Sequence, residues 1–328
     1  MAGMRAVVCE GAGGVDVLRI GELEDPTPGP DEVVIDVVAA GVNRADLLQR
    51  QGFYPPPPGA PGVIGLEVSG TISAVGAEVE GWSVGDECCA LLAGGGYAEK
   101  VLVPAPQVMP VPEGVDLISA AALPEAVATV WSNIFMGAHL KDGETILVHG
   151  GASGIGTMAI QLAVAHGARA LCTVGSTDKM DFCTRLGADV AINYKEAEWA
   201  SVVKEATNQA GADVILDIMG AKYLQDNVKS LAFDGRLVVI GMQGGTKGEV
   251  DLGRLMSRRG SITGAGLRAR SVEDKGRILA EVVGHVWPLF AAKKVRPIVY
   301  RTFPLEAVAK AHETLEQSTQ IGKVLLTT

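Results

Sequence analysis

The spacing of hydrophobic residues divides this chain into parts. In the first third, short apolar runs alternate with Gly, Pro and acidic residues, which is typical of β-strands joined by turns. Because few stretches there have helical spacing, the pattern predicts a compact antiparallel barrel. The expected strands are Met4–Cys9, Glu32–Ala39, Glu67–Val75, Glu87–Leu92 and Tyr97–Val103.

After Pro124, apolar strands alternate with helices that have one apolar face, which predicts a parallel, doubly wound sheet. The expected strands are Thr145–His149, Ala170–Val174, Val190–Asn193, Asp213–Ile218, Leu237–Ile240 and Ser261–Leu267. The expected helices are Ala126–Leu140, Ile155–His166, Lys179–Leu186, Glu198–Asn208 and Lys222–Leu231. Helices at Lys275–Ala292 and Leu305–Leu315, with strands at Val299–Phe303 and Lys323–Leu326, suggest a return to the first domain.

Composition narrows the classes of protein that fit this pattern. A chain of 328 residues is long enough for two domains. Its net charge of -10 disfavours a nucleic-acid partner, which would need basic patches. We see no apolar run long enough to span a membrane and no signal peptide at the start. The five cysteines lack metal spacing, so we expect reduced thiols and a cytoplasmic location.

The strongest motif follows the strand Thr145–His149, where the sequence reads Gly150-Gly151-Ala152-Ser153-Gly154-Ile155-Gly156 before a helix. Glycines allow a tight turn and let the backbone approach a pyrophosphate, while the helix start offers free N–H groups and a positive dipole end. A tight strand–helix turn needs glycine anyway, but the surrounding strand–helix alternation favours dinucleotide binding. We expect Gly151, Ser153, Gly154, Ile155 and Gly156 to bind the cofactor.

The end of the next strand predicts which dinucleotide is bound. An acid there would bind the ribose diol of NADH and repel a 2′-phosphate. Gly175 and Ser176 stand there instead, and Lys179 lies one helical turn further, which favours NADPH. Tyr194 is a candidate cover for the adenine or its phosphate. Lys179 also fits an ordinary solvated lysine, and Tyr194 fits packing at a strand end.

Three segments carry a resemblance to a known family. They are the run from Ala40 to Tyr54, which includes Asn43-Arg44-Ala45-Asp46, the run Gly65-Leu66-Glu67-Val68-Ser69-Gly70, and Gly94-Gly95-Gly96-Tyr97-Ala98-Glu99. Together they resemble the zinc-free quinone oxidoreductases of the medium-chain dehydrogenase/reductase superfamily, over the whole chain. The Asn-Arg-Ala-Asp run and the Ser-Gly-x-Gly end of the phosphate loop are similar to the p53-inducible branch.

The resemblance implies an α/β fold in which a GroES-like, β-rich catalytic domain accompanies a Rossmann domain with a doubly wound parallel sheet. We place the catalytic domain at residues 1–124 and 268–328, and the NADPH-binding Rossmann domain at residues 125–267, with the active site in the cleft. Zinc-dependent relatives carry Cys and His ligands in the segments matched by Gly41-Val42-Asn43 and Gly65-Leu66-Glu67. Since Leu66 cannot bind a metal and the cysteines are scattered, we expect no metal site.

A metal-free site suits an electron-poor acceptor, so we expect direct hydride transfer from NADPH to a quinone, driven by proximity and orientation. The resemblance implies catalytic roles for Tyr54, which would stack on the quinone or hydrogen-bond its oxygen, and for Asn43, which would orient the ribose or donate to the substrate. Tyr54 also fits packing against the proline run Pro55–Pro58. Asn43 also fits a helix N-cap, with Asp46 as a local hydrogen-bond partner.

Further cofactor contacts are expected at the carboxyl ends of the later parallel strands, from Gly220, Gly241, Met242, Gly266 and Leu267. Gly220 and Gly241 equally fit ordinary turns. The resemblance adds Thr129 and Lys323 to the cofactor contacts. His149, beside the phosphate loop, is interpreted as a strand histidine with satisfied hydrogen bonds rather than a proton relay.

Two other functions remain open. An NADPH-dependent reductase of α,β-unsaturated ketones or aldehydes needs the same hydride geometry, and a non-catalytic NADPH-binding protein of the zeta-crystallin type shares the fold. A small-molecule quinone or enone is the expected substrate. The resemblance also implies a homodimer through the edge strand at Ser261–Leu267, with a covered edge as the alternative.

Overall fold

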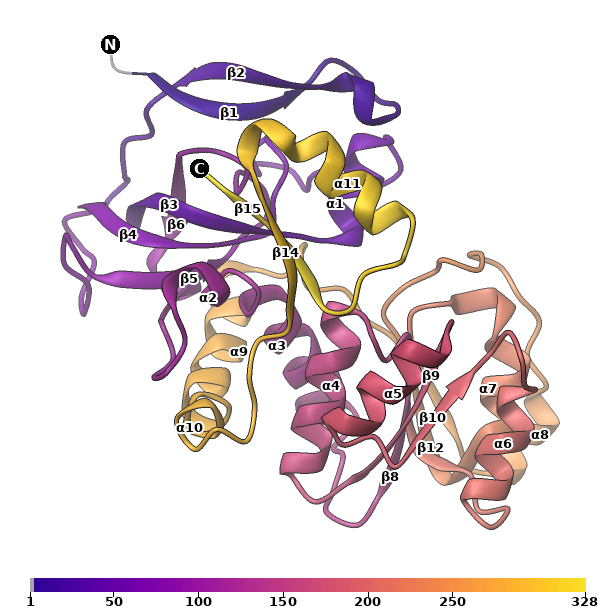
Figure 1. Ribbon diagram of the computed structural model, residues 1–328. Helices are drawn as coiled ribbons and strands as arrows, with labels where there is room; N and C mark the ends of the chain where they lie inside the picture. The colour runs from indigo at the N-terminus through magenta and orange to yellow at the C-terminus, as the bar shows by residue number, and fades with distance from the viewer. Residues whose placement is uncertain (1–2) are drawn as a thin grey trace. The chain divides into compact units, whose positions relative to one another are not determined.

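The chain forms two compact units in the computed structural model, which describes residues 3–328 (Figure 1). Unit 1 contains the residues up to Ala128 together with Leu267–Thr328, and unit 2 contains Thr129–Gly266. The chain therefore leaves unit 1, builds unit 2, and returns to complete unit 1.

Unit 1 is built on a mainly antiparallel sheet. Its strand order is β14-β15-β3-β4-β5-β7, with β6 also paired to β3. The central strand β3 pairs with β4, β6 and β15, so one strand joins the N-terminal and C-terminal parts of the unit. The strands are β3 (Glu32–Val42), β4 (Glu67–Val75), β5 (Glu87–Leu91), β6 (Lys100–Pro104), β7 (Val108–Pro110), β14 (Val299–Pro304) and β15 (Lys323–Thr327), beside a separate hairpin of β1 (Gly3–Cys9) and β2 (Leu18–Glu24).

The helices of unit 1 lie in the connections between these strands. Short helix α1 follows β3 directly, and α11 packs against β14 and β15. The helices are α1 (Arg44–Arg50), α2 (Leu117–Ala120), α3 (Pro124–Val130, which crosses into unit 2), α9 (Val272–His285), α10 (Trp287–Ala291) and α11 (Val308–Glu316), with short 3-10 turns η1 (Val15–Val17), η2 (Ala105–Gln107) and η5 (Leu305–Ala307). The apolar core gathers alternate residues of β3, including the fully buried Val33 and Ile35.

Unit 2 contains a six-stranded parallel sheet of order β10-β9-β8-β11-β12-β13. The central strand β8 is almost wholly buried, which explains its run of apolar residues. The strands are β8 (Thr145–His149), β9 (Arg169–Val174), β10 (Val190–Asn193), β11 (Ala212–Asp217), β12 (Leu231–Val239) and β13 (Ser261–Gly264). The helices are α4 (Gly154–Ala165), α5 (Thr177–Leu186), α6 (Trp199–Ala206), α7 (Leu224–Ser230) and α8 (Leu252–Ser257), with η3 (Trp131–Gly137) and η4 (Gly220–Lys222).

The predicted fold class is confirmed, and several predicted bounds are wrong. The helix expected at Ala126–Leu140 is α3 followed by the π-helical turn η3, and it ends before His139, whose φ of 50° breaks the helix. The helix expected at Lys275–Ala292 is two helices, because Pro288 lies in the first turn of α10 and cannot continue α9. The strand expected at Ser261–Leu267 ends at Gly264.

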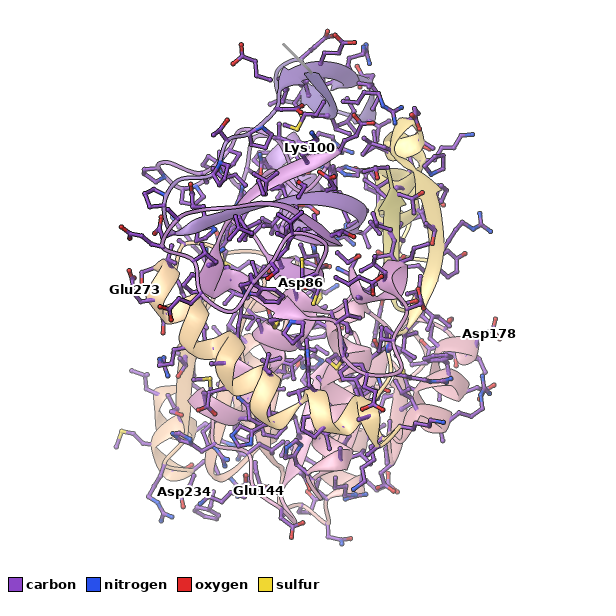
Figure 2. All side chains as sticks on the ribbon, turned by 90° about the vertical axis from the view of Figure 1, so that its left-hand side faces the viewer. Asp86, Lys100, Glu144, Asp178, Asp234 and Glu273 are labelled. Atoms are coloured by element: carbon purple, nitrogen blue, oxygen red, sulfur yellow. The ribbon has the colours of Figure 1, made fainter. Side chains whose placement is uncertain are left out.

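Charged side chains lie mainly at the periphery of each unit, as Figure 2 shows for Asp178, Asp234 and Glu273, all of which are exposed. Over residues 3–328, no helix is both long and apolar enough to cross a membrane.

Candidate functional site

The glycine-rich loop between β8 and α4 is shaped by close backbone packing. Gly150 has a φ of 72°, a conformation that favours glycine. A Cβ on Gly156 would lie 2.8 Å from the Cα of Gly151, so only glycine lets the first turn of α4 pack on the loop. Ser153 caps the helix, because its hydroxyl accepts a 3.0 Å hydrogen bond from the N–H of Gly156.

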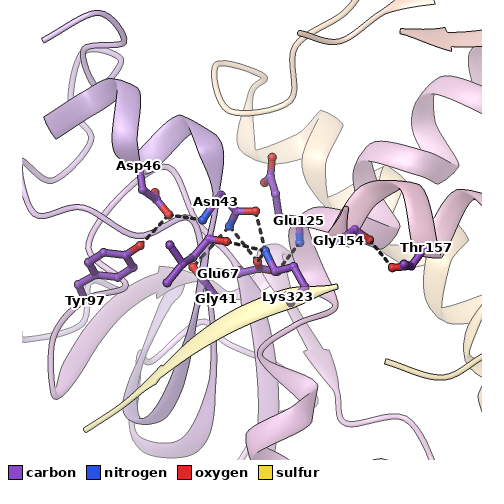
Figure 3. A network of polar contacts seen from close by, with 10 residues as sticks. Gly41, Asn43, Asp46, Glu67, Tyr97, Glu125, Gly154, Thr157 and Lys323 are labelled. Atoms are coloured by element: carbon purple, nitrogen blue, oxygen red, sulfur yellow. Dashed lines mark hydrogen bonds and ion pairs between the residues drawn. The ribbon is translucent and has the colours of Figure 1, made fainter. Parts of the chain in front are cut away.

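The same helix start matches what a dinucleotide needs. Gly154 and Ile155 form the first helical positions of α4, whose N–H groups have no partner four residues earlier. The Thr157 hydroxyl donates to the Gly154 carbonyl at 3.1 Å (Figure 3). Backbone N–H groups and a positive dipole end at a strand–helix turn are suited to a diphosphate.

At the carboxyl end of the neighbouring strand β9, the structure brings four residues together. A Cβ on Gly175 would lie 2.7 Å from the Tyr194 hydroxyl, so Tyr194 packs directly on Gly175. Ser176 is the N-cap residue of α5, and Lys179 follows within its first turn. Burial lowers the pKa of Lys179, and the charge of Lys195 lowers it further. Lys195 was missed by the sequence analysis, although it follows Tyr194 directly.

The ends of β11 and β12 approach the same region of unit 2. Gly220 has a φ of 69°, and a Cβ on it would lie 3.1 Å from the Cα of Met242. A Cβ on Gly241 would lie 2.8 Å from the Ile218 carbonyl, and one on Gly150 would lie 2.5 Å from the Ile218 side chain. Gly220 and Gly241 are thus required by close packing next to the phosphate loop.

The remaining predicted cofactor residues are more dispersed. A Cβ on Gly266 would meet nothing within 4 Å, and Thr129 is buried at the start of unit 2, where its carbonyl accepts a 2.8 Å hydrogen bond from the Asn133 side chain. Leu267 and Lys323 belong to unit 1. Leu267 was predicted to end a strand, but β13 ends three residues earlier, at Gly264.

His149 is buried and fully hydrogen-bonded. Its Nε2 bonds to Oδ1 of Asn227 at 2.7 Å, and its Nδ1 bonds to the Thr173 hydroxyl at 2.9 Å. Burial lowers its pKa to about 4, so the ring is neutral at physiological pH. The interpretation of His149 as a satisfied strand histidine is confirmed.

A buried polar cluster in unit 1 contains Asn43 and Lys323. The Lys323 ammonium donates to Glu67 Oε1 at 2.5 Å, to Asn43 Oδ1 at 2.7 Å and to the Val42 carbonyl at 3.2 Å (Figure 3). The Asn43 amide also donates to Glu67 Oε1, at 2.8 Å. Glu67 is 0% exposed and Lys323 is 6% exposed, so this is a buried ion pair.

Gly41 makes room for this ion pair. A Cβ at that position would collide with the carboxylate of Glu67 and would lie 2.7 Å from the Ala121 carbonyl. The other oxygen of Glu67 accepts the backbone N–H of Glu125 at 2.9 Å. The role of Glu67 could not be predicted from its motif, because nothing in the sequence shows that β4 and β15 both border β3.

A second line of buried polar groups supports the start of α1. Asp46 accepts the Asn43 N–H at 2.7 Å and the Tyr97 hydroxyl at 2.9 Å, which confirms the interpretation of Asp46 as a local helix partner. His312 bonds to Tyr97 at 3.3 Å and to Arg50 at 3.3 Å. Burial raises the pKa of Asp46 to about 6 and lowers that of His312 to about 3.

Glu125 is the most perturbed carboxyl group of this cluster. Burial, and then the charge of Glu67, raise its pKa to about 8. Its Oε2 atom is buried and has no hydrogen-bond partner within the described part of the chain. Lys275, 3% exposed on α9, lies within electrostatic reach, and burial lowers its pKa. Glu125 is therefore protonated near neutral pH.

Tyr54 lies under a buried arginine. The Arg268 guanidinium lies 5.3 Å from the centre of the Tyr54 ring, and it donates to the carbonyls of Ala93 and Tyr54 and to the Gln49 side chain. The ring is half-buried, and burial raises its pKa. Arg268 was missed by the sequence analysis. It fixes the loop that carries Tyr54, and the contact involves the face of the ring.

The donor set around Asn43 does not suit a metal ion. The Glu67 carboxylate already binds the Lys323 ammonium, and the positions beside it are Leu66 and Gly41. Among residues 3–328, no group of three or more His, Cys, Asp or Glu side chains is placed to hold a metal ion.

Comparisons with known proteins show the family to which this chain belongs. Residues 29–113 match the alcohol dehydrogenase GroES-like domain, and residues 154–281 match the zinc-binding dehydrogenase model. The quinone oxidoreductase of Rattus norvegicus is 32% identical, over 98% of this chain and 97% of its own length. A solved structure of an NAD-dependent alcohol dehydrogenase has a TM-score of 0.88 at 32% identity, covering 99% of this chain and 100% of that one. An enoyl reductase structure has a TM-score of 0.88 at 26% identity, covering 99% of each chain.

Three observations point to the same protein family. They are the full-length similarity to a quinone oxidoreductase, the GroES-like match in unit 1 and the parallel sheet of unit 2. One solved structure that this chain resembles is named as NAD-dependent, and the strand–helix turn of unit 2 has closely packed glycines and a helix start, which is the arrangement typical of dinucleotide sites. The chain belongs to the quinone oxidoreductase family of the medium-chain dehydrogenase/reductase superfamily, and it is an oxidoreductase.

Proposed function

We propose that this oxidoreductase is an NADPH-dependent quinone reductase that transfers a hydride directly, without a metal ion. The observation that carries the proposal is the phosphate loop of unit 2, where Gly150, Gly151 and Gly156 pack so closely that no side chain fits. When bound, the nicotinamide cofactor supplies the hydride. The protein's part is to bind and orient the two reactants.

The preference for NADPH rests on charge at the end of β9. Lys179 and Lys195 lie close enough for one to lower the pKa of the other, and no acid stands at Gly175 or Ser176. Two lysines at this strand end, where no acid occupies the last position of the strand, favour a 2′-phosphate. We also propose that the other predicted residues contact the cofactor. They are Thr129, Ser153, Gly154, Ile155, Tyr194, Gly220, Gly241, Met242, Gly266, Leu267 and Lys323.

Changing Ser176 and Lys179 together to Ala tests this preference. We expect the double variant to lose NADPH affinity by about 10-fold or more and to keep its NADH affinity, since one charge-assisted contact contributes about 1.5–3 kcal/mol. Lys141→Ala, in an exposed turn of the same unit, is the control. Calorimetry that finds the NADPH preference intact in the double variant rejects the argument.

On the substrate side we propose Asn43 and Tyr54 as the groups that contact the nicotinamide ribose and the quinone. The Asn43 amide is held at both ends, by Lys323 and by Glu67. Its oxygen keeps one lone pair, so we propose that it accepts a ribose hydroxyl rather than donating to the substrate. Tyr54, with one face toward Arg268, is proposed to offer its hydroxyl or its other face to the quinone.

Reduction of a quinone to a hydroquinone also consumes a proton. Glu125 holds one near neutral pH, and its Oε2 atom has no partner among the described residues. We propose Glu125 as the proton source, because a carboxylic acid of raised pKa is suited to general-acid catalysis.

The alternative is a reductase of α,β-unsaturated ketones or aldehydes, which the similarity to an enoyl reductase favours. A panel of ortho- and para-quinones and enones, followed by NADPH absorbance, separates the two. We expect higher kcat/KM for quinones. Turnover with enones alone supports the alternative, and no turnover with any acceptor indicates a non-catalytic NADPH-binding protein.

We also propose a cytoplasmic homodimer joined through β13. This strand lies at the edge of the six-stranded sheet, and all four of its residues are exposed. An exposed edge strand offers unpaired backbone groups to a second copy. Light scattering should give twice the chain mass, and a monomer at micromolar concentration rejects the dimer. The five cysteines are free, as expected for a reducing compartment.

A further inference from the structure

Two cysteines in unit 2 form a buried thiol pair. Cys172 lies in the middle of β9 and Cys183 lies in α5, and both are 0% exposed. Both are free, and their side chains are hydrogen-bonded to each other. Nothing in the proposed reduction of quinones uses either of them.

The pair lies directly against the phosphate loop. A Cβ placed on Gly151 would lie 2.7 Å from the sulfur of Cys172 and 3.4 Å from the sulfur of Cys183. The N–H of Gly151 donates to the carbonyl of Thr173, the residue after Cys172, at 3.0 Å. The two sulfur atoms therefore fill the space where a side chain of residue 151 would be.

The pair also contacts the helix that carries the predicted 2′-phosphate contact. Lys179 precedes Cys183 by four residues and so shares its face of α5. The hydrogen bond from Cys172 lowers the pKa of Cys183, and the charge of Lys179 lowers it further, whereas the hydrogen bond with Cys183 and burial raise the pKa of Cys172. Cys183 is thus the sulfur that becomes a thiolate more readily, which makes it the nucleophile of the pair.

We propose that Cys172 and Cys183 are a reversible redox site, in which hydrogen peroxide joins them in a disulfide and weakens nucleotide binding at the adjacent loop. The Cys183 thiolate attacks one peroxide oxygen, the O–O bond breaks, and a sulfenic acid and hydroxide form. The Cys172 sulfur then attacks the sulfenic sulfur, an S–S bond forms, and the sulfenic oxygen leaves as water. Overall, two thiols and one peroxide give one disulfide and two waters, and thiol–disulfide exchange with a dithiol reverses the change.

The effect on the loop follows from packing. A disulfide bond is about 2.05 Å long, which is well below the contact distance of two thiols, so β9 and α5 must move closer at this point. Protein interiors have few voids to absorb such a shift. Since Gly151 rests on both sulfurs and Lys179 is on the moving helix, the loop and the lysine are displaced relative to each other.

Binding and oxidation are then linked in both directions. If the disulfide form binds NADPH more weakly by some factor, bound NADPH opposes disulfide formation by the same factor at equilibrium. Because both thiols are buried, peroxide reaches them only through local opening, and a ligand that holds the loop closed slows that opening as well. Saturating NADPH is therefore expected to protect the pair.

The test exposes the full-length protein to hydrogen peroxide and measures its intact mass, its linked peptides and its NADPH affinity by calorimetry. We expect the loss of two hydrogens, a Cys172–Cys183 linked peptide, and an NADPH affinity lower by about 10-fold, in the range of typical coupling. A dithiol reductant should restore both. Oxidation should be slower with NADPH present.

Variants separate this site from the other thiols. Cys172→Ala and Cys183→Ala should keep their NADPH affinity after peroxide, whereas Cys88→Ala, at a buried thiol of unit 1, should respond like the wild type. The proposal is overturned if the disulfide forms elsewhere, if the mass does not change, or if the Cys172–Cys183 disulfide leaves the NADPH affinity unchanged. These outcomes are measured on the wild-type protein, so they hold even if a variant does not fold. The affinity arm rests on the proposed NADPH site. If the untreated protein binds no NADPH, that function fails, while the peptide map still tests the redox pair.

Discussion

Replacing Lys323 by Met removes the cation of the buried cluster in unit 1. The ammonium makes three contacts, to Glu67, Asn43 and the Val42 carbonyl, at 2.5, 2.7 and 3.2 Å. Its loss leaves the Glu67 carboxylate, which is 0% exposed, with only the Asn43 amide and the Glu125 N–H. Breaking a buried pair in this way costs about 3–5 kcal/mol of unfolding free energy.

A double-mutant cycle isolates the interaction from other effects of the change. Glu67→Gln alone leaves the buried Lys323 ammonium without a charged partner and should lower the unfolding free energy by a similar amount. The double variant, which also has Lys323→Met, buries no unpaired charge. We therefore expect the double variant to be no less stable than either single variant, which corresponds to a coupling energy of at least about 3 kcal/mol.

Urea unfolding gives the unfolding free energy of each variant in the cycle. Tryptophan fluorescence and circular dichroism should report the same transition, which is the condition for a two-state free energy. Arg277→Met is the control, because Arg277 pairs with Asp274 while its own side chain is 62% exposed, and such pairs contribute little. Additive losses, or a loss below about 1 kcal/mol for Lys323→Met, would refute the description of this cluster as a buried ion pair.

Three further substitutions give separate tests. Gly41→Ala should destabilise unit 1 in urea because the new Cβ meets the buried ion pair, whereas Gly284→Ala, with nothing within 4 Å in α9, should not; equal effects contradict the packing argument. Glu125 keeps its proton up to about pH 8 in the folded state and loses it near 4.5 when unfolded, so wild-type stability falls as pH rises between these values. The stability of Glu125→Gln relative to wild type should therefore increase as the pH rises from about 4.5 to about 8. If the unfolding free energies of the two proteins change with pH in the same way, the raised pKa of Glu125 is wrong. Gly156→Ala should abolish NADPH binding in calorimetry, since its Cβ would lie 2.8 Å from Gly151 Cα; unchanged affinity would exclude a role for this packing.

Much of unit 2 could be predicted from sequence because its elements are local and strongly patterned. Thr145–His149 and Val190–Asn193 are strands with the predicted bounds, and the glycine-rich turn lies between a buried strand and a helix as expected. Helix α8, at Leu252–Ser257, was missed because it is only 6 residues long and none of its residues is buried.

Unit 1 was less predictable because its strands pair over long sequence distances. The hairpin strand β2 was missed, since only Leu18 of its residues is buried and its alternation is weak. The ion pair joins Glu67 to Lys323, residues separated by all of unit 2, and sequence spacing carries no information on such a contact. Asn43 and Lys323 were both selected from the resemblance, but their direct hydrogen bond appears only in the structure.

Single-turnover kinetics test whether a hydride passes directly from NADPH to a quinone without a metal ion. Chelator-treated protein is mixed with a quinone and with either NADPH or NADPH carrying deuterium at both C4 positions, and the loss of NADPH absorbance is followed. We expect full activity after chelation and slower reduction with the deuterated cofactor. Activity that disappears with the chelator and returns with zinc, or equal rates for the two cofactors, would contradict it.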